Sequence, residues 1–437
     1  MSTTIKQLYQ LFESCTQIST DSRTVEKDTL FFALSGERFD GNRFAKNALE
    51  KGAKYAVIDN VEYQEDDRYI LVKDALKSLQ DLAYYHRQQF KIPIIGITGS
   101  NGKTTTKELM ASVLSSHYRT HFTSGNFNNH IGVPLTLLAM PKETEVAIIE
   151  MGMNHLGEIA ALCEIADPTH GLITNIGKAH LEGVGGIEGV KKAKSELYDY
   201  LKAKNHLLFV NRDEPFLWEL AGESYRKKLA YSSHPEKAAH SIYQAIPESL
   251  EPTVKVRFRD DLGNNVPVQT QLMGAYNFQN VMTAITIGQY FKVPPLKIKA
   301  AIEQYVPTNN RSQWIEKGSN IFLLDAYNAN PSSMSNVLDY FEQYKAERKV
   351  VILGDMLELG KESLSEHQYI VQQAKKKGFD QIILVGQHFG ACRSDQLHFD
   401  TVEALIEWFS GQTFKETAFL VKGSRGIQLE QLLETID

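Results

Sequence analysis

The sequence is poor in cysteine, and its few cysteines form no recognisable pattern. Among its 437 residues there are three, Cys15, Cys163 and Cys392, which are odd in number and far apart. That arrangement fits neither a disulfide framework nor the spacing of metal ligands. We therefore expect a protein of the reducing cytoplasm that has no structural disulfides.

The sequence also has no basic excess and no long apolar run. Lys and Arg number 47 against 53 Asp and Glu, a net charge of -6, so binding to a nucleic-acid backbone is not expected. No segment reaches the ~18 uninterrupted apolar residues of a membrane-spanning helix. The N-terminus lacks a basic region followed by an apolar stretch. We expect a monomer that is neither exported nor inserted in a membrane.

What is present is an ordinary globular composition, 42% hydrophobic and 23% charged, at a length typical of about three domains. Short apolar runs alternate with helical patterns over most of the chain, which favours α/β domains with parallel sheets. Alternating apolar residues within 241–272 predict a small antiparallel hairpin. The predicted domains are a small α/β domain over 1–88, a central parallel-sheet ATPase domain over 89–308, and a Rossmann-like α/β domain over 309–437.

A phosphate-binding loop is the strongest motif. A buried strand candidate, Ile94–Thr98, leads into a glycine turn and then a helix, so that backbone N–H groups and the helix dipole face an anion. A lysine can reach the terminal phosphates of ATP, and a threonine hydroxyl can bind Mg²⁺. Ile97 stands where the regular motif has its first glycine. The expected ATP-binding residues here are Gly99, Ser100, Asn101, Gly102, Lys103, Thr104 and Thr105.

Two further candidates follow strands of the central domain. Glu150 ends the apolar run 146–149, at the sheet edge where parallel sheets bind ligands. It could equally be a solvated loop acid. His180 follows another strand and could bind a metal through a ring nitrogen, although a lone loop histidine usually has no such role.

Three more patterns each allow a functional and a structural interpretation. Lys194 lies in a charged run, 191–196, whose simplest interpretation is a solvated helix face. Asn277 and Asn280 occupy one helical turn and could recognise a base or cap the helix. The stretch 325–333 follows a strand of the third domain and could line a site or form an Asn/Pro turn that caps a helix.

Taken in order, these motifs resemble the Mur ligases, ATP-dependent enzymes that extend the peptide stem of the peptidoglycan precursor. The resemblance covers essentially the whole chain. It is closest to members that add a dipeptide, since Tyr327-Asn-Ala-Asn330 stands where relatives that add other residues carry a Tyr-Ala-His type sequence. The stretches that carry it are Gly125–Pro134, Asp325–Pro331 and Leu353–Gly360.

The resemblance implies a reaction and a set of ligands. ATP would drive ligation of D-alanyl-D-alanine to UDP-N-acetylmuramoyl-tripeptide through an acyl phosphate, with the third domain closing on the nucleotide and binding the dipeptide. Glu150 and His180 would bind Mg²⁺ together with Thr104. Lys194, in an Ala-Lys-x-Glu sequence, would be carbamylated and would help to hold a metal ion. The catalytic residues implied are Lys103, Glu150, His180 and Lys194.

The resemblance also assigns the remaining contacts. Asn277 and Asn280 would lie against adenine, and Arg311, Asp325, Tyr327 and Asn328 would reach the nucleotide from the third domain. The uridine nucleotide would contact Ser22, Arg23, Gly36 and Asp40, and the peptide would contact Asn128 and Asn129. The sequence departs from many members at Tyr276, where histidine is common, and at Ala326, where a polar residue is common.

Two other functions fit part of this pattern. One is a ligase that attaches a single amino acid, such as diaminopimelate, or glutamate to folate. The other is a nucleotide-switched binding protein, which the absence of an Asn-Lys-x-Asp guanine motif disfavours.

Overall fold

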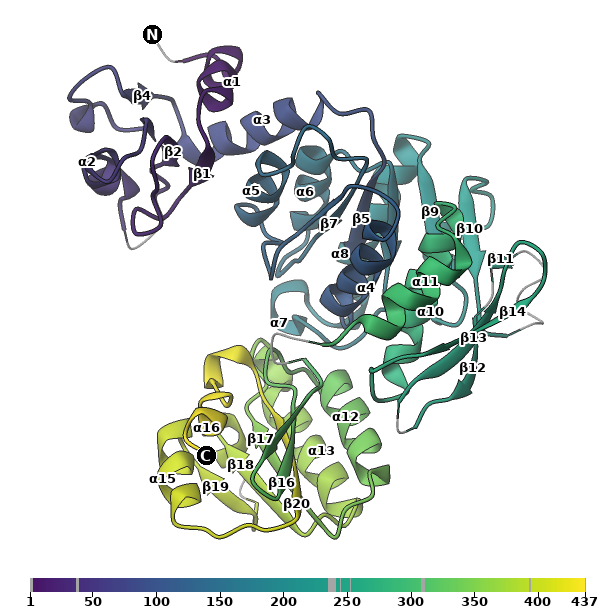
Figure 1. Cartoon of the computed structure of the whole chain (residues 1–437). Helices are drawn as coiled ribbons and strands as arrows, with labels where there is room; N and C mark the ends of the chain where they lie inside the picture. The colour runs from purple at the N-terminus through teal and green to yellow at the C-terminus, as the bar shows by residue number, and fades with distance from the viewer. Residues whose placement is uncertain are drawn as a thin grey trace.

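The computed structural model describes residues 3–36, 39–234, 241–243, 245–251, 253–307, 311–392 and 394–436. Figure 1 shows the N-terminal domain in purple and the C-terminal domain in yellow-green, both flanking a central domain in blue and teal. Within these ranges, no helix combines the length and the apolar character that crossing a membrane requires. Each of the three predicted α/β units is present and contains its own main sheet.

The N-terminal domain is a four-stranded parallel sheet in the order β1-β2-β3-β4. The predicted small α/β domain is present, with its longer strands at Thr29–Phe32 and Tyr55–Ile58, whereas the two three-residue strands are too short to predict. Its elements are α1 (Ile5–Glu13), β1 (Gln17–Ser19), β2 (Thr29–Phe32), η1 (Gly41–Phe44), α2 (Ala45–Glu50), β3 (Tyr55–Ile58), η2 (Val61–Tyr63), β4 (Tyr69–Leu71) and α3 (Ala75–Arg87).

Helix α3 connects this domain to the central one, and its C-terminal end forms hydrogen bonds with the central domain. Asp74 caps its start by accepting a hydrogen bond from the Lys77 N–H. At its end the buried Arg87 donates from Nε to the carbonyl of Ala166 (3.0 Å) and from a terminal nitrogen to that of Asp167 (3.0 Å). A buried guanidinium bonded to carbonyl groups in this way fixes the junction of the two domains.

The central domain contains the predicted parallel sheet, which has seven strands in the order β11-β10-β9-β8-β5-β7-β6. The strands are β5 (Ile94–Thr98), β6 (Thr120–Phe122), β7 (Val146–Glu150), β8 (His170–Ile173), β9 (Leu207–Asn211), β10 (Lys228–Tyr231) and β11 (Ser241–Tyr243). Its helices are α4 (Lys103–Ser115), α5 (Gly132–Leu138), α6 (Glu158–Ala166), α7 (Leu181–Val184), α8 (Ile187–Ala203), α9 (Leu217–Ala221), α10 (Tyr276–Tyr290) and α11 (Pro295–Gln304).

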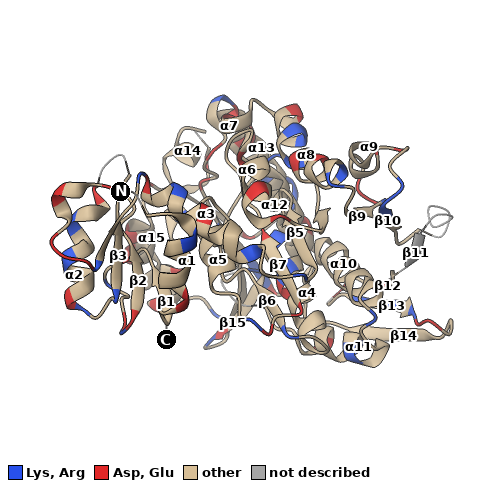
Figure 2. Cartoon of the chain, turned by 90° about the horizontal axis from the view of Figure 1, so that it is seen from above, with Lys and Arg blue, Asp and Glu red and all other residues tan. Residues whose placement is uncertain are grey.

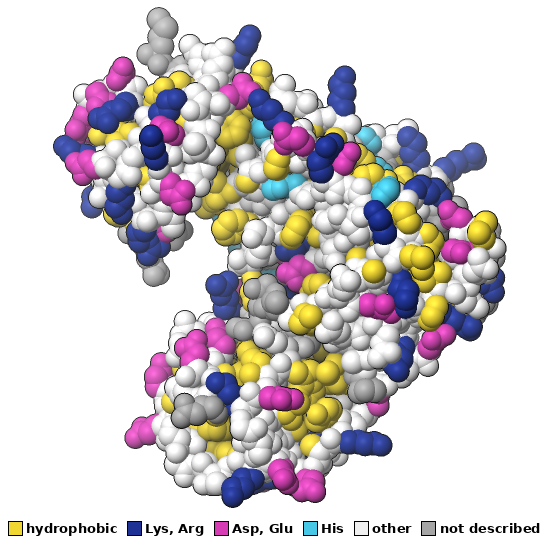
Figure 3. All heavy atoms as spheres, in the orientation of Figure 1, with side chains coloured by type: hydrophobic (Ala, Val, Ile, Leu, Met, Phe, Trp, Pro, Cys, Tyr) yellow, Lys and Arg dark blue, Asp and Glu magenta, His cyan; other side chains and the backbone are white. Residues whose placement is uncertain are grey.

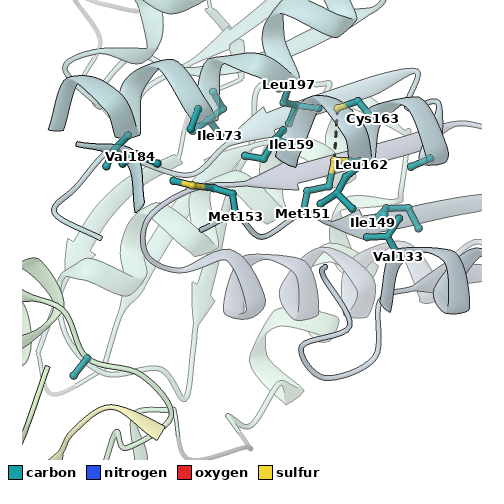
Figure 4. Packing of buried hydrophobic residues seen from close by; sticks show 14 of the residues in the cluster. Val133, Ile149, Met151, Met153, Ile159, Leu162, Cys163, Ile173, Val184 and Leu197 are labelled. Atoms are coloured by element: carbon teal, nitrogen blue, oxygen red, sulfur yellow. Dashed lines mark hydrogen bonds between the residues drawn. The ribbon is translucent and has the colours of Figure 1, made fainter. Parts of the chain in front are cut away.

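Strands β5 and β7 are buried on both faces because helices cover both sides of the sheet. Alternate residues of a strand point to opposite faces. Ile148 accordingly packs in the cluster under α4 and α10, whereas Ile149 packs in the cluster under α5, α6 and α8. Figure 4 shows Ile149 and Met151 packed against Val133 and Leu162 on this second face. This packing fixes the end of β7, where Glu150 lies.

The segment 241–272 differs in part from its predicted form. The predicted hairpin is confirmed by the antiparallel pairing of β13 (Lys255–Arg259) with β14 (Asn265–Gln269), which β12 (Ala245–Ser249) extends to three strands. Residues 241–243, at the start of this segment, are not part of the hairpin. Strand β11 pairs parallel with β10 and so extends the central sheet, and a three-residue strand has too little pattern to reveal its partner.

The C-terminal domain has a six-stranded sheet in the order β15-β16-β20-β17-β18-β19. Its strands are parallel except for β15, which pairs antiparallel with β16 and makes the sheet mixed. The elements are β15 (Gln313–Lys317), β16 (Asn320–Leu324), α12 (Pro331–Gln343), β17 (Arg348–Gly354), η4 (Gly360–Glu362), α13 (Ser363–Lys376), β18 (Gln381–Val385), α14 (Gln387–Gly390), β19 (Leu397–Phe399), α15 (Val402–Ser410), β20 (Thr417–Lys422), η5 (Arg425–Ile427) and α16 (Gln431–Glu434). The boundaries after 88 and 308 stay predictions, and the second falls on residues outside the described ranges.

Candidate active site at the phosphate loop

A cavity of about 810 Å³ lies between the central and C-terminal domains, around the phosphate loop. Figure 3 shows the molecule hollowed on one side between its N-terminal and C-terminal ends, with charged side chains at the inner rim. Most of the predicted site residues line the cavity: Ser100, Asn101, Gly102, Lys103, Thr104, Thr105, Asn128, Asn129, Glu150, His180, Asn277, Asn280, Arg311, Asp325, Tyr327 and Asn328.

The phosphate loop needs glycine at the two positions that the sequence supplies. Gly99 has a φ of +150° and Gly102 a φ of +76°, a backbone region that L-residues with side chains avoid. A β-carbon on Gly99 would lie 1.8 Å from the Thr174 hydroxyl oxygen, so the loop passes too close for any other residue. The loop is therefore a tight strand-to-helix turn despite the missing first glycine at Ile97.

Lys103, the first residue of α4, folds back over this loop. Its Nζ donates to the Gly99 carbonyl at 2.7 Å. Burial lowers the pKa of Lys103, and the carboxylate of Glu150 opposes that shift. The lysine thus faces the space that an anion on the helix N-terminus would occupy.

Glu150 is a buried carboxylate, so the alternative of a solvated loop acid does not hold. It is 1% exposed, and its Oε1 accepts hydrogen bonds from the Thr104 hydroxyl (3.2 Å) and the Asn128 amide (2.8 Å). Its Oε2 lies 3.5 Å from Nζ of Lys107, which is equally buried. Lys107 was not among the predicted site residues, because no sequence motif marks it. A buried acid nevertheless needs a cationic partner, and α4 provides one on its inward face.

Lys194 is also buried, which excludes the solvated helix face as its environment. It lies on α8 at 0% exposure, and its Nζ has no hydrogen-bond partner among the described residues. Burial lowers its pKa well below the usual value, and the positive charge of Lys103 adds to this. Its motif partner Glu196 instead caps α6, accepting from the N–H groups of Gly157 (2.7 Å) and Ala160 (2.9 Å).

His180 pairs with an acid of the C-terminal domain that the sequence argument did not single out. Its Nδ1 lies 2.5 Å from Oε2 of Glu358. Both residues lie in the left-handed backbone region, with φ of +54° and +66°. Glu358 belongs to the stretch 353–360 that carries part of the family resemblance, and this was the available signal.

A second direct contact joins the C-terminal domain to the phosphate loop. Asn330 donates from Nδ2 to Oδ1 of Asn101 at 2.8 Å, and it also caps α12 in a capping box with Ser333. The predicted helix cap in 325–333 is therefore present, and the same residue contacts the phosphate loop.

The rest of the C-terminal wall carries the other predicted residues. Asp325 pairs with the buried Lys422 at 2.6 Å and accepts from the Ser312 N–H at 3.1 Å. Lys422 also donates to the carbonyl of Asn328 at 3.1 Å. The Arg311 guanidinium lies 3.8 Å from the ring centre of Tyr327. These contacts order the loop that follows β16.

Asn277 and Asn280 are buried and already bonded within the protein. Asn280 donates to Oδ1 of Asn277 at 2.9 Å and accepts from the Thr106 hydroxyl at 2.9 Å, whereas Asn277 donates to the Met273 carbonyl at 2.7 Å. Neither residue caps α10, because the N-cap position is Ala275. Tyr276, one of the departures from the family pattern, bonds to Ser312 of the C-terminal domain at 2.8 Å.

The structure does not bring the predicted uridine-site residues to this cavity. Ser22, Arg23, Gly36 and Asp40 belong to the N-terminal domain and are absent from the residues that line it. Arg23 pairs with Asp21 at 2.7 Å. Hydrogen bonds led by the Asn42 side chain lower the pKa of Asp40.

The donor groups around Glu150 suit magnesium. In the ranges that the structure describes, no three His, Cys, Asp or Glu side chains gather closely enough to hold a metal ion by themselves. Mg²⁺ typically takes one or two carboxylates, substrate phosphates and water. Glu150 Oε2, which has no hydrogen-bond donor among the described residues, and the Thr104 hydroxyl are oxygen ligands of this kind beside the phosphate loop.

Comparison with known proteins decides the family. Three family models match: the catalytic domain of the Mur ligase family over 14–95, the Mur ligase middle domain over 97–288, and the Mur ligase glutamate ligase domain over 310–425. The UDP-N-acetylmuramoyl-tripeptide–D-alanyl-D-alanine ligase of Bacillus subtilis (strain 168) is 35% identical over 434 residues, which cover 96% of this chain and 92% of the relative. The chain belongs to the Mur ligase family.

Other relatives of this Mur ligase agree. The Escherichia coli (strain K12) protein of the same name is 33% identical over 96% of this chain and 93% of its own. A crystal structure of MurF from Acinetobacter baumannii has a TM-score of 0.85 at 30% identity, covering 99% of this chain and 98% of that one. The MurF ligase of Thermotoga maritima in complex with ADP, at 24% identity, shares the fold with a TM-score of 0.83 over 97% of both chains.

Proposed function

We propose that this Mur ligase joins D-alanyl-D-alanine to UDP-N-acetylmuramoyl-tripeptide with hydrolysis of ATP, giving the UDP-N-acetylmuramoyl-pentapeptide of peptidoglycan synthesis. The names of its Bacillus subtilis and Escherichia coli relatives state this pair of substrates. The observation that carries the proposal is the phosphate loop of this Mur ligase, which faces a cavity that the C-terminal domain completes.

The reaction has two steps. The tripeptide carboxylate attacks the γ-phosphorus of ATP, so that an acyl phosphate forms and ADP leaves. The dipeptide amine then attacks the acyl carbon, the carbon–oxygen bond to phosphate breaks, and inorganic phosphate and one proton are released. Phosphate is a far better leaving group than the hydroxide of the free acid, which is why ATP is needed.

The central wall binds and orients the phosphates. The N–H groups at the start of α4 and the ammonium of Lys103 face the anion, which offsets repulsion between carboxylate and γ-phosphate. Thr104, Glu150 and His180 would hold Mg²⁺, which supplies charge neutralisation at the phosphate oxygens. Asn277 and Asn280 would lie against adenine, and Arg311, Asp325, Tyr327 and Asn328 would approach the nucleotide when the C-terminal domain closes.

The environment of Lys194 supports the proposal that this lysine is carbamylated. Its neutral amine would add to CO₂ and lose a proton, giving an anionic carbamate. Burial and the charge of Lys103 favour the neutral amine that this step requires. A buried carbamate close to Lys103 would be a better-paired group than a buried ammonium, and its oxygens would be further ligands for a metal ion.

The remaining assignments concern the UDP-linked tripeptide, the cellular location of the protein, its oligomeric state and its partners. We place the uridine nucleotide at Ser22, Arg23, Gly36 and Asp40 of the N-terminal domain, and the peptide at Asn128 and Asn129. We also propose a cytoplasmic monomer without nucleic-acid or membrane partners. In support, Figure 2 shows Lys and Arg interspersed with Asp and Glu rather than gathered on one face.

An ADP-release assay tests the reaction. Release should require UDP-N-acetylmuramoyl-tripeptide and D-alanyl-D-alanine together, and should stay at background with diaminopimelate, or with glutamate and folate. Release driven by a single amino acid would support the related ligase instead. Nucleotide turnover that needs no acceptor would support a nucleotide-switched binding protein.

A further inference from the structure

Among the described residues that line the cavity between the central and C-terminal domains, one cation has neither an ion pair nor a place in the proposed ATP site. Among the described lining residues the cations other than histidine are Lys103, Arg311, Lys422 and Arg425. Lys103 bonds the phosphate loop, and Lys422 pairs with Asp325. Arg425 is exposed to the cavity, and among the described residues no carboxylate lies within ion-pair distance of its guanidinium.

The two arginines of the cavity both approach the ring of Tyr327, but they come from different loops of the C-terminal domain. Arg311 lies on the phosphate side, because its charge contributes to lowering the pKa of both Lys103 and Lys107. Arg425 begins η5, in the loop that follows β20. Its guanidinium lies 5.6 Å from the ring centre of Tyr327, whereas that of Arg311 lies 3.8 Å from the same ring.

The backbone that carries Arg425 is fixed by its neighbours. Ser424, 3% exposed, donates its N–H to the Asp355 carbonyl (3.0 Å) and accepts at Oγ from the Leu357 N–H (3.0 Å). These loops follow β20 and β17, so Arg425 leaves the carboxyl edge of the sheet, where α/β domains bind ligands. Because these hydrogen bonds already hold the backbone next to Arg425, its guanidinium can bind an anion with little further loss of backbone conformational entropy.

The proposed reaction supplies an anion for this cation. D-alanyl-D-alanine enters with its amine toward the acyl phosphate, so its carboxylate must lie farther from the phosphate loop. A carboxylate inside a cavity needs a compensating charge, and arginine offers paired N–H donors that match its two oxygens. We propose that the Arg425 guanidinium binds the carboxylate of the incoming dipeptide, an inference that rests on the proposed function.

The test compares two dipeptides on matched variants. Wild-type enzyme should use D-alanyl-D-alanine at least about tenfold better, by kcat/KM, than D-alanyl-D-alaninamide, which lacks the carboxylate. In Arg425→Gln the KM for the dipeptide should rise about 10- to 100-fold, and the preference over the amide should fall below about threefold. KM for ATP and for the UDP-linked tripeptide should stay within about twofold. Arg425→Lys should recover part of the preference because it restores charge without the paired donors.

Arg348→Gln is the control, since Arg348 is an exposed arginine beside an aromatic ring at the opposite, amino end of β17. It should keep wild-type kinetics. The inference is overturned if Arg425→Gln keeps the full preference for the free acid, or if it raises KM for ATP or tripeptide instead. Failure of the wild type to ligate the dipeptide at all would refute the proposed function and is a separate outcome. Arg425 is exposed, so thermal unfolding of Arg425→Gln should match the wild type.

Discussion

The two walls of the cavity hold their charges in different ways. On the central side Glu150 lines the cavity, whereas Lys107 and Lys194 are buried in the same domain without lining it; all three are at most 1% exposed and are fixed by a sheet edge and two helices. On the C-terminal wall Arg425 is exposed, and the Glu358 side chain is 54% exposed, on loops after β20 and β17. Lys422 and Asp325, whose side chains are 2% and 18% exposed, are more enclosed than either of these.

This difference in burial indicates which step of the reaction each wall serves. Buried, prealigned charges stabilise a transition state without reorganisation, which suits phosphoryl transfer at the central wall. Exposed charges on loops can meet ligands that arrive later and can adjust as a domain closes. Substitutions on the central wall should therefore cost more activity than those on the C-terminal loops.

The largest expected effect is that of Lys194→Ala. If a carbamate at this position helps to hold a metal ion, ADP release should fall at least about a thousandfold, and wild-type activity should rise with added bicarbonate after CO₂ depletion. Lys192→Ala, an exposed lysine on the same helix, should behave as wild type. Full activity in Lys194→Ala would remove carbamylation from the account.

Glu150→Gln should have the next largest effect. The amide keeps the size of the side chain but leaves Lys107 buried without its carboxylate, so kcat should fall about a hundredfold or more, and the free energy of unfolding should fall by about 2 kcal/mol. Chemical denaturation of Glu150→Gln, Lys107→Met and the double variant measures the coupling. Additive losses in this cycle would show that the pair is not coupled.

A smaller effect is expected for Glu358→Gln. The ion pair with His180 crosses between domains and one partner is largely exposed, so unfolding free energy should change by less than about 1 kcal/mol and kcat by less than about tenfold. Glu362→Gln, an exposed acid a few residues away, serves as the control in the same assay. A loss as large as that of Glu150→Gln would contradict the contrast between the two walls.

The smallest effect concerns pH. Burial, with a smaller contribution from Asp213, raises the pKa of Glu214 at the cavity edge from 4.5 to about 7. Between these values the folded chain keeps a proton that the unfolded chain has released, so the stabilising contribution of Glu214 is lost as the pH rises. Glu214→Gln should match the wild type near pH 5 and be about 1 kcal/mol more stable near pH 8. Glu219→Gln, on an exposed site of α9, should show no such difference.

Much of the fold could be predicted because its core strands are continuous apolar runs. Strands β5 and β7 and their following helices were visible in this way, and the phosphate loop between β5 and α4 placed the candidate site. Strands β1, β11 and β19 have three residues each, too few for a periodic signal, and β15 is an edge strand without a fully buried residue.

Site residues could be predicted where a single polar residue follows the end of a predicted strand. Glu150 and His180 were found in this way. Lys107, Glu358 and Lys422 were not, because each matters through a partner distant in sequence that only the fold brings near. For Lys194 the local pattern predicted a solvated helix face. That prediction is wrong, because the face of α8 that carries Lys194 is packed inside the central domain.

The most direct test of the central claim follows the oxygen atoms of the tripeptide carboxylate. With ¹⁸O in the terminal carboxylate of UDP-N-acetylmuramoyl-tripeptide, one turnover with ATP and D-alanyl-D-alanine should place one ¹⁸O in the inorganic phosphate, read by mass spectrometry. The label arrives there because the bridging oxygen of the acyl phosphate leaves with phosphorus. Phosphate without ¹⁸O, formed at the same rate as the pentapeptide, would contradict the acyl-phosphate mechanism.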